Sequence, residues 1–179
     1  MNEVIKKNGI KFGIISGLVS IVIALAVYLI DYKLFASSAV GVISILSGII
    51  ISILLFVYTK KELNGILSFK DGFTVYFIYT INSIAIATLF NILLYNVIDP
   101  ELKEKVTEII IEKTAEMMKS FGGSNQMLKE TIKQMREQDQ FSISNLAVGS
   151  IWTVALSCIW GLILAAIFKS KSTNSPFNE

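Results

Sequence analysis

Long stretches without charged residues are the feature that most constrains the fold of this sequence. In the clearest of them, from Phe73 to Ile98, there is no Lys, Arg, Asp, Glu or His. A helix rises about 1.5 Å per residue, so these residues reach roughly 39 Å, more than the ~30 Å hydrocarbon core of a bilayer requires. Asp71 and Asp99 flank the run, one near each end, where water is available. We therefore predict a transmembrane helix over residues 73–98.

Three further uncharged runs are long enough to cross a membrane. They cover residues 12–30, 39–58 and 146–168. Only 17% of the residues are charged, whereas about a quarter are charged in a typical soluble domain. The predicted fold class is an all-α integral membrane protein. We expect one domain over residues 1–179, with four transmembrane helices in a bundle and an amphipathic helical hairpin between the third and fourth spans.

The first run admits a second interpretation. A basic end followed by an apolar stretch also describes a secretory signal peptide, and residues 37–39 could serve as its cleavage site. However, the run is longer than the usual signal core of about 7–15 residues. Gly9, Gly13 and Gly17 also follow one another at four-residue spacing, which lets another helix approach closely. This spacing favours a transmembrane helix that is kept in the mature protein.

Small residues also recur every four positions in the other predicted spans. At this spacing they lie along one face of a helix, where they favour helix packing. The predicted packing positions are Gly13 and Gly17 in the first span, Ser44, Gly48 and Ser52 in the second, Ser83 and Ala87 in the third, and Gly149, Thr153, Ser157 and Gly161 in the fourth. The four positions in the last span form the clearest such ridge in the sequence.

Three asparagines lie within the third span, Asn82, Asn91 and Asn96, and the last two are near its far end. An amide within a membrane needs a hydrogen-bond partner, and we expect Asn82 to find one on a neighbouring helix. Asn91 lies nearer the end of the span, where water can reach it. The alternative is that Asn82 or Asn91 binds a solute.

Residues 99–145 form the only large region outside the predicted spans. Asp99 is a good N-cap and Pro100 suits the first helical position, while Gly122 and Gly123 end that helix and Ser124 can cap a second one. The first helix carries an apolar stripe that we interpret as a partner surface: Leu102, Val106, Ile109, Met117 and Phe121. Alternatively, the two helices pack on each other, on the mouth of the bundle, or on lipid headgroups. With seven basic and nine acidic residues, the region is not expected to be strongly attracted to anionic lipid.

The distribution of lysines predicts the orientation. Four spans place both termini on one side, and the short flanks on that side carry eight lysines. The opposite side also carries eight basic residues, but seven of them are spread along the hairpin. The positive-inside rule then places both termini in the cytoplasm and the hairpin outside. We expect residues 169–179 to be a disordered cytoplasmic tail.

Two short motifs carry a resemblance to a known family. The sequence SFKDGF at residues 68–73 precedes the third span, and IDPE at residues 98–101 follows it. With the four spans and the chain length, they resemble a bacterial membrane-protein family catalogued as domain of unknown function 4199. The resemblance implies a location in the bacterial inner membrane. It supplies no established activity and no catalytic residues.

The sequence disfavours several classes of function. It contains no histidine, and no charged side chain lies within a predicted span to act as an acid, a base or a metal ligand. We therefore expect no enzyme activity, no cofactor and no metal, and the absence of a separate basic patch argues against nucleic acid. The leading hypothesis is an accessory, scaffold or envelope protein that contacts the lipid bilayer and a membrane-protein partner or a second copy. The alternative is a subunit of an oligomeric channel or transporter for a neutral solute.

Overall fold

The computed structural model describes residues 2–122 and 124–170, and all regular structure in this part of the chain is helical. Four helices are long and apolar enough to cross a membrane. They are α1 (Glu3–Ile30), α2 (Ser38–Glu62), α3 (Phe69–Leu93) with its π-helical continuation η2 (Leu94–Ile98), and α6 (Ile143–Phe168). A short 3-10 helix, η1 (Tyr32–Ala36), connects α1 to α2, and α4 (Leu102–Ser120) and α5 (Asn125–Glu137) form a hairpin. The predicted fold class is confirmed.

The long helices α1 and α3 begin before their uncharged runs, because polar side chains in the flanks cap their first turns. The Asn2 side chain caps α1 by accepting the Val4 N–H at 2.9 Å, so the helix begins at Glu3, nine residues before the predicted start of the span at Phe12. At the start of α3, Ser68 Oγ accepts the Asp71 N–H at 3.0 Å and donates to the Asp71 carboxylate at 2.7 Å. The SFKDGF motif is therefore a helix start.

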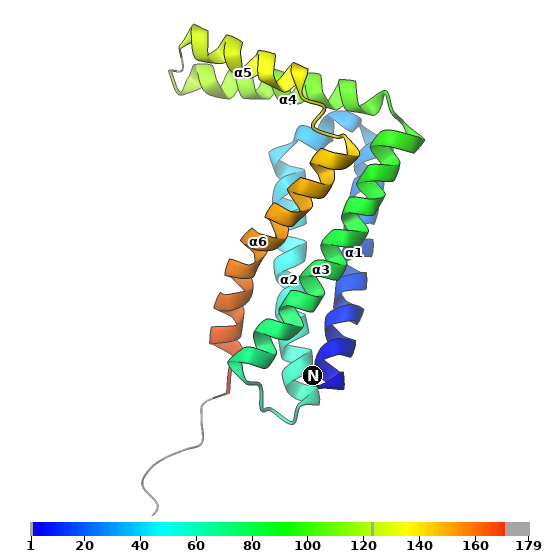
Figure 1. Ribbon diagram of the computed structural model, residues 1–179, viewed down its shortest axis with the longest axis vertical. Helices are drawn as coiled ribbons and strands as arrows, with labels where there is room; N and C mark the ends of the chain where they lie inside the picture. Colours follow the sequence, from blue (N-terminus) through cyan, green and yellow to red (C-terminus); the bar gives the residue numbers. More distant parts are fainter. Residues whose placement is uncertain (1, 123, 171–179) are drawn as a thin grey trace, which may run out of the picture.

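The four long helices lie lengthwise beside one another, and the hairpin crosses one end of them (Figure 1). The first helix begins and the last helix ends at the opposite end (Figure 1). We call these the hairpin end and the terminal end. Within the four long helices, α3 makes its most extensive contacts with α1 and α6.

The start of the predicted disordered tail is bound. Ser170 N–H donates to the Leu67 carbonyl at 2.8 Å, and Leu67 N–H donates to Ser170 Oγ at 2.9 Å. The prediction of disorder is therefore wrong for Ser170, because the α2–α3 loop supplies backbone partners for it. Residues 171–179 lie outside the described part of the chain.

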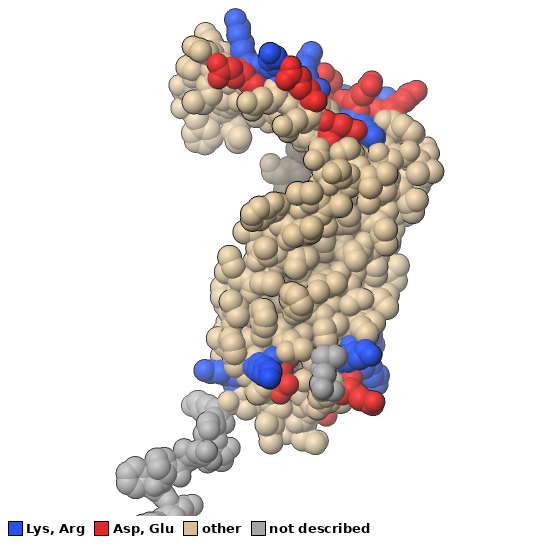
Figure 2. Space-filling model, in the orientation of Figure 1, with Lys and Arg blue, Asp and Glu red and all other residues tan. Residues whose placement is uncertain are grey.

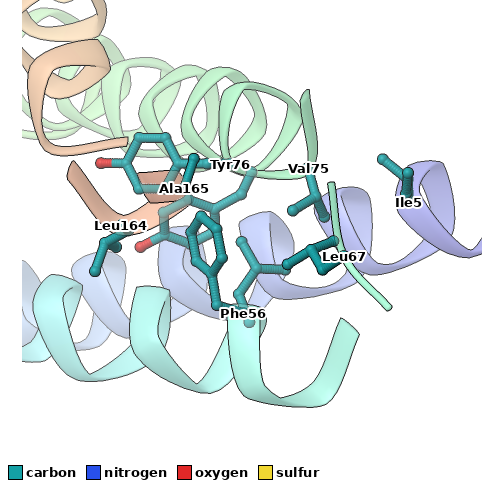
Figure 3. Close-up of a cluster of buried hydrophobic side chains, with 9 residues drawn as sticks. Ile5, Phe56, Leu67, Val75, Tyr76, Leu164 and Ala165 are labelled. Atoms are coloured by element: carbon teal, nitrogen blue, oxygen red, sulfur yellow. The ribbon is translucent and has the colours of Figure 1, made fainter. Parts of the chain in front are cut away.

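The buried apolar side chains form two clusters, one at each end. At the terminal end, Phe56 packs among Tyr76, Leu164 and Ala165 (Figure 3), with the Phe56 and Tyr76 ring centroids 6.3 Å apart. At the hairpin end, the second cluster consists of Leu94, Tyr95, Leu102 and Val106. Because the second cluster draws on both η2 and α4, it attaches the hairpin to the spans.

Candidate functional site

The glycines of α1 form a seam against α3. A Cβ atom built on each glycine would lie 2.7 Å from the Cβ atom of a residue on α3, far closer than two such atoms approach. The three pairs are Gly9 with Ile78, Gly13 with Asn82, and Gly17 with Ile86. Both members of the pairs step by four residues, so the two helices lie in a fixed register along the whole seam. Only glycine allows this approach, which explains the sequence spacing.

The predicted ridge of α6 is in contact at only one end. A Cβ atom on Gly161 would overlap the Tyr76 ring, and Ser157 is half-buried. Nothing lies within 4 Å of a Cβ atom on Gly149, and Thr153 is exposed and donates to the Gly149 carbonyl of its own helix. The prediction of a packing contact is therefore wrong for Gly149 and Thr153 among the described residues. Four-residue spacing defines a helix face, but it does not determine how far a neighbouring helix covers that face.

The predicted packing positions of α2 divide in the same way. Ser52 is buried and accepts a hydrogen bond from the Trp160 indole N–H at 3.4 Å, which joins α2 to α6. Ser44 is exposed and donates to the Val40 carbonyl within its own helix, and a Cβ atom on Gly48 would meet nothing within 4 Å. The packing prediction is therefore wrong for Ser44. It is also wrong for Gly48 as a site of close helix approach, although the Gly48 carbonyl is in contact with α3.

A hydroxyl network joins three spans near their middle. Tyr79 Oη lies 3.2 Å from Ser16 Oγ on α1 and donates to the Gly48 carbonyl on α2 at 3.3 Å. Ser83, a predicted packing residue one turn after Tyr79, donates to Ser16 Oγ at 2.9 Å. Ser20 donates to the Ser16 carbonyl at 3.0 Å. The network satisfies hydroxyls that would otherwise be buried in a medium without water.

Sequence reasoning missed Ser16 and Tyr79. The available signal was the spacing of Tyr79 and Ser83, which places two hydroxyls on one face of α3 beside the glycine-rich face of α1. It also missed Asn8, which is fully buried and donates to Glu62 Oε2 at 2.9 Å. That bond ties α1 to the last turn of α2.

Asn82 does not make the interhelical bond that we predicted. Its amide donates to the Ile78 carbonyl of its own helix at 2.8 Å. The contact with α1 is made by its Cβ atom, which faces Gly13. The close approach of the two backbones leaves the amide no room between them, so it bonds to the preceding turn of α3.

Asn91 lines a small cavity between α1, α2 and α3. The cavity has a volume of about 250 Å³, and its polar lining comes from Asn91, Ser20 and Ser44. The predicted packing residue Ala87 lies in the same wall, and the remaining lining side chains are apolar. Sites for small molecules usually have about 300–1,000 Å³. The cavity is thus smaller than a usual ligand site.

The root of the hairpin buries two of the five residues of the predicted partner surface. Leu102 and Val106 are each only 1% exposed, because they pack against Leu94 and Tyr95. Both residues are therefore removed from the partner surface. Ile109 is half-buried, whereas Met117 and Phe121 are 55% and 85% exposed.

Asp99 fixes the start of α4 from three residues away. Its Oδ1 accepts the Leu102 N–H at 3.2 Å, and its Oδ2 accepts the Tyr28 hydroxyl at 3.3 Å. The IDPE motif thus joins the hairpin to α1. Farther along α4, the Lys113 amine donates to the Ala36 carbonyl.

The outer side of the hairpin is charged, whereas the body of the spans is uncharged on the face seen in Figure 2. Lys103 pairs with Asp139 at 3.0 Å, and Arg136 pairs with Glu108 at 3.1 Å. These pairs connect α4 to α5 and to the residues that follow α5. Around them lies an open groove of about 810 Å³, lined by residues from the start of α4 and the end of α5.

Within residues 2–122 and 124–170, no three His, Cys, Asp or Glu side chains are close enough to hold a metal ion. Cys158 is a free, half-buried thiol in α6. Two hollows bear on function: the groove on the hairpin and the small cavity between the spans.

Comparison with known proteins decides the family. The model of the family described as "Protein of unknown function (DUF4199)" matches residues 11–170. The chain belongs to this family. The match covers α1 from residue 11 onward, the other three long helices and the hairpin. Neither the search of curated proteins nor the search of solved structures gave a match.

Proposed function

We propose that this protein is a non-enzymatic accessory or scaffold protein of the bacterial inner membrane that binds a partner through its hairpin. The observation that carries the proposal is the groove of about 810 Å³ on the outer side of the hairpin. It is more than three times the volume of the cavity between the spans, which is about 250 Å³. Its position outside the spans makes it accessible to another protein.

The groove suits a charged or polar segment better than an apolar one. Lys103, Glu104, Glu108, Arg136 and Asp139 line it, so both signs of charge are present within one surface. Arg is enriched at protein interfaces because its planar group makes paired hydrogen bonds. The proposed partner surface is therefore the charged side of α4 and α5 rather than the apolar stripe, in which Leu102 and Val106 are buried.

The orientation follows from the lysines at the terminal end. We propose that this end faces the cytoplasm, where the positive-inside rule places short basic flanks. The hairpin then lies on the extracytoplasmic side, and the partner is an envelope or membrane protein with a segment on that side. A second copy of the chain is an alternative occupant of the groove.

The test is site-specific photocrosslinking of the full-length protein in native membranes. A photoreactive residue replaces Thr107 in the groove, and a second variant carries it at Glu116, outside the groove lining. We expect a discrete crosslinked species from position 107 only, and its loss on the added change Arg136→Glu. Equal products at both positions, or products that are insensitive to Arg136→Glu, contradict the proposal. A product of twice the mass identifies the second copy as the occupant.

A subunit of a channel or transporter for a neutral solute is the second candidate. The observation that favours it is the polar wall of the small cavity, formed by Ser20, Ser44 and Asn91. Vesicles containing the purified protein should then take up small neutral solutes faster than empty vesicles. Asn91→Leu should abolish the difference, whereas Asn82→Leu should not, because the Asn82 amide is bonded within α3.

A further inference from the structure

The side of the hairpin that faces the spans continues beyond them as an exposed apolar surface. Along α4, one face begins with the buried residues Leu102 and Val106 and continues to Met117 and Phe121. Just beyond the turn, Met127 on α5 is 57% exposed. We call the three exposed side chains Met117, Phe121 and Met127 the apolar tip.

The apolar tip points away from the charged side of the hairpin. At about 100° per residue, Met127 and Arg136 lie on opposite sides of α5. Phe121 is likewise turned well away from Glu108 on α4. Since Arg136 and Glu108 pair on the outer side, the tip faces the other way, toward the level of the spans. In Figure 2 the charged side chains of the hairpin gather on its outer side, and uncharged atoms form its underside.

The space beneath the tip lies beside the lipid-facing surface of the spans. The hairpin runs crosswise and projects past the ends of the long helices (Figure 1). Near that end, the outward faces of the spans carry exposed apolar residues, such as Val42 and Ile43 on α2 and Ile151 and Trp152 on α6. The bilayer that surrounds these helices therefore extends directly beneath the overhanging hairpin.

We propose that the hairpin lies flat on the membrane surface, with Met117, Phe121 and Met127 inserted at the boundary between headgroups and acyl chains. A helix with one charged and one apolar side adopts this position in membranes. A protein partner is a poorer occupant, because a specific protein interface buries about 1,000 Å² or more, and the tip offers only three side chains. The inference does not depend on the proposed partner in the groove, since it concerns the opposite side of the hairpin.

Insertion rests on apolar area rather than on attraction between charges. The hairpin region carries seven basic and nine acidic residues, so it has no net positive charge to hold it on anionic lipid. Lys113 lies seven residues after Val106, on the same face of α4, and its amine is bonded to the Ala36 carbonyl. The hairpin should therefore lie equally deep in neutral and in anionic membranes, and salt should not release it.

The test uses the full-length protein in phosphatidylcholine vesicles, with Cys158→Ala as the background. An environment-sensitive fluorophore is attached through Phe121→Cys, and the matched control carries it through Lys119→Cys. The two positions are separated by two residues and lie on nearly opposite sides of α4. We expect blue-shifted emission, quenching by shallow nitroxide lipids and shielding from aqueous iodide at position 121, but not at position 119. Adding phosphatidylserine or salt should leave the difference unchanged.

Equal iodide quenching at the two positions in vesicles would overturn the proposal. In a second experiment the fluorophore is placed away from the side chains that are changed, so that it does not replace the contact being tested. With the fluorophore at Met127→Cys, the added changes Met117→Ser and Phe121→Ser should reduce quenching by nitroxide lipids. Unchanged quenching would show that the tip does not hold the hairpin on the membrane. Purified protein contains no partner, so either result leaves the crosslinking test of the groove independent.

Discussion

Replacing Gly13 by Ala should separate α1 from α3. A Cβ atom at this position would lie 2.7 Å from Asn82 Cβ and 2.8 Å from the Tyr79 carbonyl oxygen. Neither atom can rotate away, because one is backbone and the other is fixed to it. The helices must therefore move apart along the seam, and such overpacking costs about 1–3 kcal/mol.

The matched control is Gly149→Ala, where a Cβ atom meets nothing within 4 Å. Both substitutions gain the same helix propensity, about 1 kcal/mol. The difference between the two variants therefore isolates the contact at the seam. We expect Gly13→Ala to be less stable than Gly149→Ala by about 1–3 kcal/mol in reversible unfolding from mixed micelles. Equal stabilities would refute the argument that the seam requires glycine.

Three further predictions concern the hydroxyl network, the root of the hairpin and the orientation. Tyr79→Phe should lower stability by roughly 0.6 kcal/mol and at most about 1.7 kcal/mol, the range for hydrogen bonds between membrane helices. Tyr58→Phe, on the exposed side of α2, should lower stability less in the same unfolding assay. A larger loss for Tyr58→Phe would contradict the role of the hydroxyl network. Asp99→Ala should cost about 1 kcal/mol because the Leu102 N–H at the start of α4 loses its bond to Asp99 Oδ1. The loss should be seen as faster amide exchange in the first turn of α4, whereas Asp99→Asn should retain most of the protection. In intact cells lacking Cys158, an impermeant thiol reagent should label Ser124→Cys and not Ile66→Cys; the opposite pattern would reverse the orientation.

Much of the fold followed from the sequence because its signals are local. A long uncharged run must form a helix in a membrane, since every backbone amide needs a partner within the same segment. The cap at Ser68 likewise depends only on residues within one turn, Ser68 and Asp71. Packing of the hairpin on the spans was only one of the alternatives that the sequence left open, because it depends on contacts between residues far apart in sequence, such as Tyr28 and Asp99.

The candidate site was only partly predictable. The four-residue spacing selected Gly13 and Gly161, which lie in contacts, together with Gly149, which does not. These positions look alike in the sequence, since the spacing describes one helix and the contact requires two. The apolar stripe on α4 has the same ambiguity: Leu102 lies over Leu94 and Tyr95, whereas Phe121 projects beyond the spans.

The sequence by itself determined four membrane-spanning helices, their approximate ends and a helical hairpin between the last two. Tertiary structure alone decided that Asn82 bonds within α3, that Tyr79 joins three spans, and that two of the five residues of the hairpin stripe are buried. The physical reason is that a polar or apolar side chain in a span takes whichever partner lies within reach. Which partner that is depends on how closely two backbones approach. For Asn82 on α3, the approach is set by Gly13, a residue on α1.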